Sequence, residues 1–374
     1  MTNNETYKVI ISGGGTGGHI YPAVAIANAL KEFAVNTEIL FVGAEGKMEM
    51  EKVPQAGYKI IGLPVAGLQR KLTFKNLSFP FKLIRSLMKA RKIIKDFKPD
   101  IAIGVGGYAS GPLLYSAAAA GIPTLIQEQN SYAGLTNKLL AKKAKKICVA
   151  YPDMKNFFPE EKIIYTGNPV RKDILEYRSK KQEGLAFFGF DENIKTILVV
   201  GGSLGARTVN ESIAANIDML LEAGVQVVWQ TGKFYYNKAN FLVAEKKTNK
   251  IKVLEFIREM NFAYSVADIV ISRAGALSIS ELCLVQKPVI LVPSPNVAED
   301  HQTKNAMALV NADAAQMIKD EQAVRVLVPA ALKLLENKEK QEIYKANIVK
   351  LGKPDAAKDI AAEVFKLLKS GSKN

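Results

Sequence analysis

The feature that most constrains the fold of this chain is the alternation of short, continuous Val/Ile/Leu-rich runs with helical segments along its length. Continuous apolar runs predict strands buried on both faces, and intervening helices predict right-handed crossovers, so the strands should form parallel sheets. The predicted strands of the first half are residues 8–12, 38–42, 59–63, 100–104, 124–127, 146–150 and 163–167. Those of the second half are residues 196–200, 226–230, 251–254, 268–272, 288–292 and 315–318.

This pattern restarts near residue 195, where a second glycine-rich turn follows a strand. The 374 residues also exceed what one core usually serves, because domains typically hold about 100–200 residues. We therefore expect an α/β protein with two tandem Rossmann-like, doubly wound domains that face each other across a cleft. The expected domains are residues 1–168 and 169–354, and an amphipathic C-terminal helix, residues 355–370, is expected to pack back on the first domain.

Composition excludes several other classes of protein. Apolar residues make up 48% and charged residues 23%, as in ordinary globular proteins. Cys148 and Cys283 are the only cysteines, which fits a reducing cytosol and argues against a disulfide framework or a structural zinc site. The sequence shows no secretory signal pattern at its start. The charge-free stretch 101–127 is interrupted by glycine and proline, which predicts strand, loop, helix and strand instead of a membrane span.

The first glycine-rich turn, SGGGTGGH, follows the first strand and precedes a helical run. Glycines let backbone N–H groups approach a ligand, and the positive end of the helix favours an anion there. The turn also satisfies GxGxxG, with Glu45 after the second strand, so a dinucleotide site remains open, although this pattern alone is weak. His19 lies at the end of this turn, where a neutral imidazole could accept a proton near physiological pH. The alternative is that His19 caps the helix.

Two further turns suggest where a diphosphate binds. GGSLGA occupies the equivalent place in the second domain, and in SRAGALSISE a strand ends, Gly275 turns and a helix begins. Free N–H groups of Ala276 to Ser278 would suit a diphosphate, and Glu281 either accepts from a ribose diol or complements the helix dipole. Arg171, at the presumed domain junction, either reaches a phosphate or lies on the surface, as arginines usually do.

Positive charge is concentrated in residues 68–98, which carry ten basic residues and one acid of a chain with net charge +15. Anionic lipid and nucleic acid both attract such a patch, but no RRM, KH or zinc-finger signature occurs, so we expect a membrane surface and no nucleic acid. The residues expected at the membrane are Leu68, Arg70, Lys71, Leu72, Phe74, Lys75, Phe79 and Phe81. Beyond them a helical stripe predicts core packing, with the lysines forming a solvated face; its members are Leu83, Leu87, Ala90, Ile94 and Phe97.

Seven segments spread in order over nearly the whole chain carry a family resemblance. They are GGGTGGHIYPAVAIA, GVGGYASGP, QEQNSYAGLTNKLLA, GNPVR, GGSLGA, SRAGALSISEL and EDHQTKNA. Together they resemble the MurG family within glycosyltransferase family 28, the bacterial UDP-N-acetylglucosamine transferases that convert lipid I to lipid II for peptidoglycan. The resemblance implies the glycosyltransferase-B fold, with the donor held mainly by the C-terminal domain and the acceptor by the N-terminal domain.

The resemblance also implies roles for individual residues. The donor would contact Arg171, Ser203, Ile257, Ala276, Leu277, Ser278, Glu281 and Gln302, with Thr16, Gly17, Gly18 and Asn130 near the sugar. Among these, Ile257 would face the uracil and Glu281 the ribose. The acceptor diphosphate would contact Gly106, Gly107 and Tyr108, and His19 is the candidate base. His301 is assigned no role.

The reaction implied by the family inverts the anomeric carbon, which needs a base for the attacking hydroxyl and stabilisation of the leaving diphosphate. No DxD motif occurs, so we expect metal-independent chemistry without a cofactor. The expected partners are UDP-N-acetylglucosamine, lipid I and the anionic cytoplasmic face of the bacterial plasma membrane. A UDP-N-acetylglucosamine 2-epimerase of the same fold, a Rossmann oxidoreductase and a nucleic-acid-binding protein are the alternatives.

Overall fold

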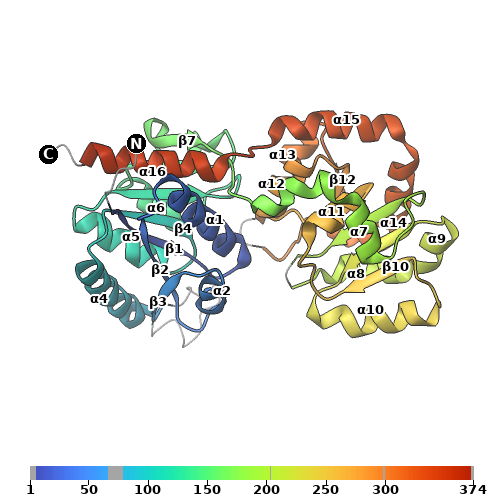
Figure 1. The fold of residues 1–374 in the computed structure, drawn as a ribbon, viewed down its shortest axis with the longest axis horizontal. Coiled ribbons are helices and arrows are strands. Elements are labelled where there is room, and N and C mark those ends of the chain that lie inside the picture. Colours follow the sequence, from blue (N-terminus) through green and yellow to red (C-terminus); the bar gives the residue numbers. More distant parts are fainter. Residues whose placement is uncertain (1–5, 66–78, 203, 298–299, 372–374) are drawn as a thin grey trace. The chain divides into compact units, whose positions relative to one another are not determined.

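The computed structural model describes residues 6–65, 79–202, 204–297 and 300–371 (Figure 1). The chain divides into unit 1, which comprises Met1–Val170 and Asp355–Asn374, and unit 2, Arg171–Pro354. The expected boundary, between residues 168 and 169, lies two residues before this division. Seven residues of the site and membrane predictions lie outside the described residues: Leu68, Arg70, Lys71, Leu72, Phe74, Lys75 and Ser203.

Within the described residues, unit 1 contains a seven-stranded parallel sheet in the order β3-β2-β1-β4-β5-β6-β7. Its strands are β1 (Lys8–Gly13), β2 (Glu38–Ala44), β3 (Lys59–Leu63), β4 (Ile101–Gly106), β5 (Thr124–Glu128), β6 (Lys146–Val149) and β7 (Ile163–Tyr165). All seven predicted strands are confirmed, with small shifts at their ends. The strand order reverses between β1 and β4, and such a switch point is where open α/β sheets bind ligands.

Helices cover both faces of this sheet. They are α1 (Gly17–Phe33), α2 (Glu49–Gln55), α4 (Phe79–Phe97), α5 (Ser110–Ala119), α6 (Leu135–Ala141) and α16 (Ala356–Gly371), with short 3-10 turns η1 (Met154–Asn156) and η2 (Glu160–Lys162). On one face α16 lies against α1, where Ile360 and Val364 are fully buried with Ile26 (Figure 1). The prediction that the C-terminal helix packs on the first domain is thus confirmed, and the apolar face of this amphipathic helix is the part that is buried.

Unit 2 holds, among its described residues, a six-stranded parallel sheet in the order β10-β9-β8-β11-β12-β13. Its strands are β8 (Thr196–Val200), β9 (Gln226–Gln230), β10 (Ile251–Leu254), β11 (Ile269–Ser272), β12 (Val289–Leu291) and β13 (Gln316–Met317). The predicted strands of the second half are all found. The order reverses between β8 and β11, which gives unit 2 its own switch point.

The helices of unit 2 enclose its sheet in two apolar layers. They are α7 (Lys181–Phe188), α8 (Arg207–Ala215), α9 (Ile217–Glu222), α10 (Lys233–Glu245), α11 (Met260–Val266), α12 (Ala276–Val285), α13 (His301–Asn311), α14 (Asp320–Glu336) and α15 (Lys338–Ile348). Two 3-10 helices complete the unit, η3 (Lys172–Lys180) and η5 (Val349–Leu351). Trp229 on β9 is fully buried, and its indole N–H donates to Asn210 Oδ1 at 3.0 Å.

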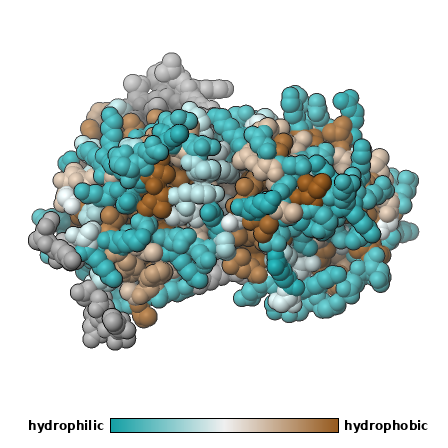
Figure 2. Space-filling model, turned by 90° about the horizontal axis from the view of Figure 1, so that it is seen from above, coloured by the Kyte–Doolittle hydropathy of each residue, from teal (hydrophilic) through white to brown (hydrophobic). Residues whose placement is uncertain are grey.

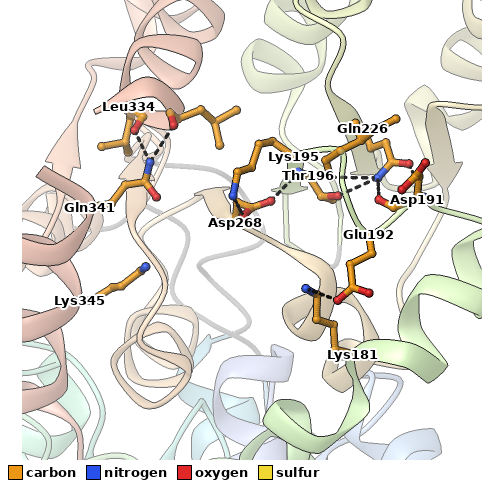
Figure 3. Close-up of polar contacts among 12 residues, drawn as sticks. Lys181, Asp191, Glu192, Lys195, Thr196, Gln226, Asp268, Leu334, Gln341 and Lys345 are labelled. Atoms are coloured by element: carbon orange, nitrogen blue, oxygen red, sulfur yellow. Dashed lines mark hydrogen bonds and ion pairs between the residues drawn. The ribbon is translucent and has the colours of Figure 1, made fainter. Parts of the chain in front are cut away.

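Polar side chains tie together the amino-terminal ends of the unit 2 strands (Figure 3). Asp268, just before β11, accepts from the Thr196 N–H and from Lys195 Nζ, both at 2.8 Å. Gln226 accepts from the Asp191 N–H at 2.7 Å, and its amide donates to the Asp191 carbonyl at 3.0 Å. This end of the sheet is therefore closed by internal bonds, and the glycine turns lie at the opposite, carboxyl end.

The surface agrees with the composition. On the face shown in Figure 2, hydrophilic side chains predominate and apolar ones form separate patches, as on most globular proteins. Stretch 101–127 forms β4, α5 and β5, which confirms its prediction as strand, loop, helix and strand. No helix among the described residues is both long enough and apolar enough to cross a bilayer.

Candidate active site

The carboxyl ends of β1 and β4 meet through direct backbone contact between two glycine turns. The Gly14 N–H donates to the Gly106 carbonyl at 3.3 Å. Gly107 has a φ of +90°, and a Cβ there would lie 2.4 Å from the Gly14 carbonyl oxygen. Only glycine fits this conformation and this approach. The predicted acceptor residues Gly106 and Gly107 thus lie beside the first glycine turn, and Tyr108, about half exposed, follows them.

His19 lies in the first turn of α1, and its imidazole points to the end of β5. Its Nδ1 is 2.9 Å from Gln129 Oε1, and a Cβ on Gly106 would lie 2.8 Å from the ring atoms Cε1 and Nδ1. Burial is the largest influence and lowers the pKa of His19 below its usual 6.5, although Glu128, the bond to Gln129 and Glu49 act to raise it. His19 is therefore a neutral imidazole at pH 7, bonded across the sheet end instead of capping its own helix.

Glu49, in α2, fills the first glycine turn. Its side chain is buried, and its carboxylate accepts from the Gly15 N–H at 2.8 Å and from the Ala44 N–H at 2.9 Å. A Cβ on Gly14 would lie 2.2 Å from a carboxylate oxygen of Glu49. The prediction that this turn offers its N–H groups to an external anion is therefore wrong at Gly15, because the protein supplies the anion itself.

The dinucleotide interpretation also required an acid after the second strand. Glu45, the residue considered for that role, is exposed and forms an ion pair with Lys89 on α4 at 2.7 Å. A surface ion pair of this kind contributes little to stability. Glu45 and the occupied glycine turn thus give no support to a dinucleotide site in unit 1.

A second buried carboxylate shapes the loop after β5. Glu128 accepts from the backbone N–H and the side-chain amide of Asn130, at 3.1 and 3.3 Å. Its other oxygen accepts from the Gly134 N–H at 3.0 Å and from Asn137 Nδ2 at 2.8 Å. Asn130, predicted near the transferred sugar, is thus held by an internal carboxylate on the same sheet end as His19.

In unit 2 the turn from β11 into α12 leaves a helix end open. Gly275 is the N-cap of α12 and has no side chain to bond the first-turn N–H groups. Ala276, Leu277 and Ser278, which follow it, are partly exposed. The first N–H groups of a helix have no intrahelical partner and lie at the positive end of its dipole, so this turn has the geometry that an anion would need.

Four further predicted donor residues also lie in unit 2. Glu281, one turn into α12, accepts from the Tyr264 hydroxyl at 3.2 Å. Burial and then the Glu281 charge raise the pKa of Tyr264 well above 10, while the positive charge of Arg171 acts to lower it, so Arg171 lies within electrostatic reach of this pair. Gln302 accepts from the Ser294 N–H at 2.9 Å and thereby fixes the start of α13. Ile257 is buried in the core of unit 2.

Sequence reasoning missed the glutamine that builds the second glycine turn. Gln230, at the end of β9, accepts from the Gly201 N–H at 3.0 Å and donates to the Gly202 carbonyl at 2.9 Å. Gly205 has a φ of +78°, and a Cβ there would lie 2.1 Å from the Thr231 carbonyl. A polar residue that follows an apolar strand run is the available signal for Gln230, and the same signal exists for Gln129, which also lies in the segment QEQNSYAGLTNKLLA. Glu49 lies in no motif.

The predicted site residues form two groups, one on each unit. His19, Thr16, Gly17, Gly18, Gly106, Gly107, Tyr108 and Asn130 lie at the carboxyl end of the unit 1 sheet. The unit 2 group comprises Arg171, Ile257, Ala276, Leu277, Ser278, Glu281 and Gln302. In the described part of the chain, no group of three His, Cys, Asp or Glu side chains is placed to hold a metal ion.

Two tandem doubly wound units with glycine turns at their switch points define a glycosyltransferase-B-type protein. A crystal structure of MurG from Acinetobacter baumannii matches 96% of this chain and 99% of its own length, with a TM-score of 0.77 and 30% identity. A UDP-GlcNAc 2-epimerase from Neisseria meningitidis, solved with UDP-GlcNAc, matches 97% of this chain and 100% of its own length, with a TM-score of 0.69. Its sequence identity is 16%, so this match shows the fold alone.

The particular family follows from the sequence comparisons. Models of the glycosyltransferase family 28 N-terminal and C-terminal domains match residues 9–149 and 196–360. A relative from Cytophaga hutchinsonii is 57% identical over 373 residues, covering 100% of both chains, and one from Parabacteroides distasonis is 59% identical over 362 residues, covering 97% and 98%. Both are named UDP-N-acetylglucosamine–N-acetylmuramyl-(pentapeptide) pyrophosphoryl-undecaprenol N-acetylglucosamine transferase. The chain belongs to glycosyltransferase family 28.

The buried His19 generates a prediction about pH. Because protonation charges a buried ring, the folded chain binds this proton less tightly than the unfolded chain, and we expect His19 to titrate below pH 6.5. The free energy of unfolding should therefore decrease as the pH falls below 6.5, the pKa of this histidine in the unfolded chain, because the unfolded chain then binds the proton first. NMR titration of the two histidines, assigned with His301→Gln, measures this directly. A pKa of 6.5 or higher for His19 would contradict the prediction.

Proposed function

We propose that this chain transfers N-acetylglucosamine from UDP-N-acetylglucosamine to the muramyl sugar of undecaprenyl-diphosphate-linked lipid I, giving lipid II for peptidoglycan. The supporting observation is identity of 57–59% over almost the full length of relatives named for this transferase. The 2-epimerase alternative is supported only by structures that are 15–16% identical to the chain.

The donor is assigned to unit 2. Its diphosphate would accept from the open N–H groups of Ala276, Leu277 and Ser278, where the helix dipole favours negative charge. Arg171 would add a charge-assisted bond, and Glu281 would accept from the ribose hydroxyls. These groups stabilise the diphosphate as it leaves and takes up the bonding electrons, which is when their contribution to the rate is largest. Ile257 would face the uracil, and the donor would also contact Ser203 and Gln302.

The acceptor and the base are assigned to unit 1. His19 would remove the proton of the attacking hydroxyl while its oxygen bonds to the anomeric carbon, on the face opposite the departing UDP, so that the configuration inverts. A neutral imidazole with a lowered pKa is in the required state at pH 7. The glycine turn of Gly106 and Gly107, with Tyr108, would hold the acceptor diphosphate, and Thr16, Gly17, Gly18 and Asn130 the sugar.

The activity is tested with radiolabelled UDP-N-acetylglucosamine and a lipid I analogue. We expect UDP release that depends on the lipid, a β-linked product and undiminished turnover in EDTA, because the assigned groups need no metal. His19→Ala should lower kcat by about 10²–10⁴-fold with little change in the KM for the donor. UDP release without acceptor, or epimerised UDP-sugar, would contradict the function, and unchanged kcat would remove His19 from the mechanism.

We also propose that unit 1 holds the protein peripherally at the cytoplasmic face of the plasma membrane through α4. The predicted stripe of this helix does face the core, where Ala90 and Ile94 are buried. The opposite face is not only basic, as expected, because Phe81, Ile84 and Met88 are 77%, 56% and 64% exposed there.

Basic residues lie among these apolar side chains, and all of the following are exposed on α4: Lys82, Arg85, Arg91, Lys92 and Lys95. An apolar stripe that enters the lipid, flanked by cations worth about 1 kcal/mol each near anionic headgroups, would bind a leaflet surface. This helix continues the basic loop predicted from the sequence, whose residues 66–78 lie outside the described part of the chain. An enzyme bound to the leaflet in this way could reach an acceptor whose lipid tail is anchored in the same membrane.

Vesicle flotation tests this surface. The full chain should float with anionic vesicles and less so in high salt, and the triple variant Phe81→Ser/Ile84→Ser/Met88→Ser should lose most of that binding. Phe234→Ser, which changes a phenylalanine of unit 2 that is even more exposed, at 89%, is the control and should float normally. Equal flotation of the triple variant and the control would refute the role of α4.

A further inference from the structure

Three buried primary amides form a hydrogen-bonded chain behind the His19 imidazole in unit 1. Gln129 Oε1 is 2.9 Å from His19 Nδ1, and Gln129 Nε2 donates to the Val105 carbonyl at 2.5 Å and to Gln127 Oε1. Gln127 Nε2 donates to Asn168 Oδ1 at 2.9 Å, and Asn168 Nδ2 donates to the Gln129 carbonyl at 3.0 Å. Each amide side chain is at most 2% exposed, so the protein itself must satisfy these groups.

Two backbone carbonyls fix the direction of every bond in this chain. A carbonyl only accepts, so the group facing Val105 must be the NH₂ of Gln129, and the group facing the Gln129 carbonyl must be the NH₂ of Asn168. Rotating either amide by 180° would place two oxygens against each other in a buried site. Gln127 joins the two with its oxygen toward Gln129 and its nitrogen toward Asn168, so all three orientations agree.

The orientation of Gln129 decides the tautomer of the histidine. Because an oxygen faces His19 Nδ1, that nitrogen must carry the hydrogen, and in a neutral imidazole the other nitrogen, Nε2, then carries the lone pair. The ring is also confined, since it lies where a side chain at Gly106 would be. The Val105 carbonyl, a second neutral oxygen, also bonds the ring and acts to raise the pKa of His19. In the Nδ1–H tautomer, Nε2 is the ring's only proton acceptor.

The group that orients the ring is neutral, although two carboxylates lie within electrostatic reach. Glu49 bonds the N–H groups of Gly15 and Ala44, and Glu128 bonds the loop after β5, so neither is the partner of the His19 ring. In a Ser-His-Asp triad the orienting group is a carboxylate, which also stabilises the charged imidazolium. An amide fixes the tautomer without this added stabilisation, so the proton affinity of His19 stays low.

We propose that Gln129 is a positioning residue that, itself oriented by Gln127 and Asn168, holds His19 in the Nδ1–H tautomer with Nε2 free to accept a proton. The proposal rests on the proposed function, because the base of that reaction is what the tautomer serves. A base in the wrong tautomer has no lone pair to offer at Nε2. A positioned base typically raises the reaction rate by roughly 10²–10⁴-fold, and loss of the ring orientation should remove part of this rate increase.

The tautomer is measured on the unaltered full chain, without any variant that risks misfolding. Histidine labelled with ¹⁵N gives two imidazole spin systems, since the chain has only His19 and His301. At neutral pH we expect His19 to show a protonated Nδ1 and an unprotonated Nε2. An Nε2–H signal, or an even mixture of both tautomers, would overturn the proposal.

Two substitutions of Gln129 separate orientation from charge. Gln129→Met keeps the volume but removes the bond, so the His19 signals should shift toward a tautomer mixture and kcat should fall at least about tenfold, with the donor KM nearly unchanged. Gln129→Glu places a carboxylate against Nδ1, so the acid limb of kcat/KM should move to higher pH. Gln226→Met, which removes an equally buried glutamine from unit 2, is the matched control and should change neither the spectrum nor the pH profile.

The failure of this proposal differs from the failure of the proposed function. If Gln129→Met keeps the wild-type tautomer and kcat, or Gln129→Glu leaves the pH profile in place, Gln129 does not position the base. If His19→Ala retains full turnover, the base itself is wrong, whatever the tautomer. Acceptor-dependent transfer that survives both results would leave the transferase intact and remove only the role of this amide chain.

Discussion

The contact between the two glycine turns of unit 1 is the constraint on which the rest of this site depends. The Gly14 N–H meets the Gly106 carbonyl, and at Gly107 no side chain fits against the facing backbone. This close approach brings the first turn of α1 to the ends of β4 and β5, so that His19 reaches Gln129. Parallel strands at a switch point provide the space, and glycine is what lets two loops share it.

The two units share one type of fold but differ in the bonds made at their glycine turns. In unit 1 an internal carboxylate, Glu49, occupies the glycine turn, so this turn serves as a rigid support beside a neutral histidine. In unit 2 the N-cap of α12 is Gly275, which leaves the first N–H groups of the helix to a ligand. We therefore propose the diphosphate site at α12 in unit 2 and the proton acceptor, His19, in unit 1. This asymmetry agrees with a donor assigned to one unit and a base to the other.

Much of the fold could be predicted because continuous apolar runs indicate buried parallel strands, and each predicted strand is present. The turns that follow strands also placed His19 and Gly275 at sheet ends. Glu49 lies in no motif, and although Gln129 follows a predicted strand, its contact with His19 joins residues 110 positions apart, as that of Glu49 with Gly15 joins residues 34 apart. No local pattern encodes such contacts. On α4, periodicity identified the buried stripe but gave no sign that Ile84 and Met88 would be exposed on the other face.

On the proposed assignment, the nucleotide diphosphate should bind the N-terminal end of α12 and not the glycine turn that Glu49 occupies. A crystal structure of the chain with UDP tests this most directly. We expect phosphate oxygens within hydrogen-bonding distance of the N–H groups of Ala276, Leu277 and Ser278, with the ribose at Glu281. Phosphate bound instead at Gly15, with the Glu49 carboxylate displaced from that N–H, would contradict it.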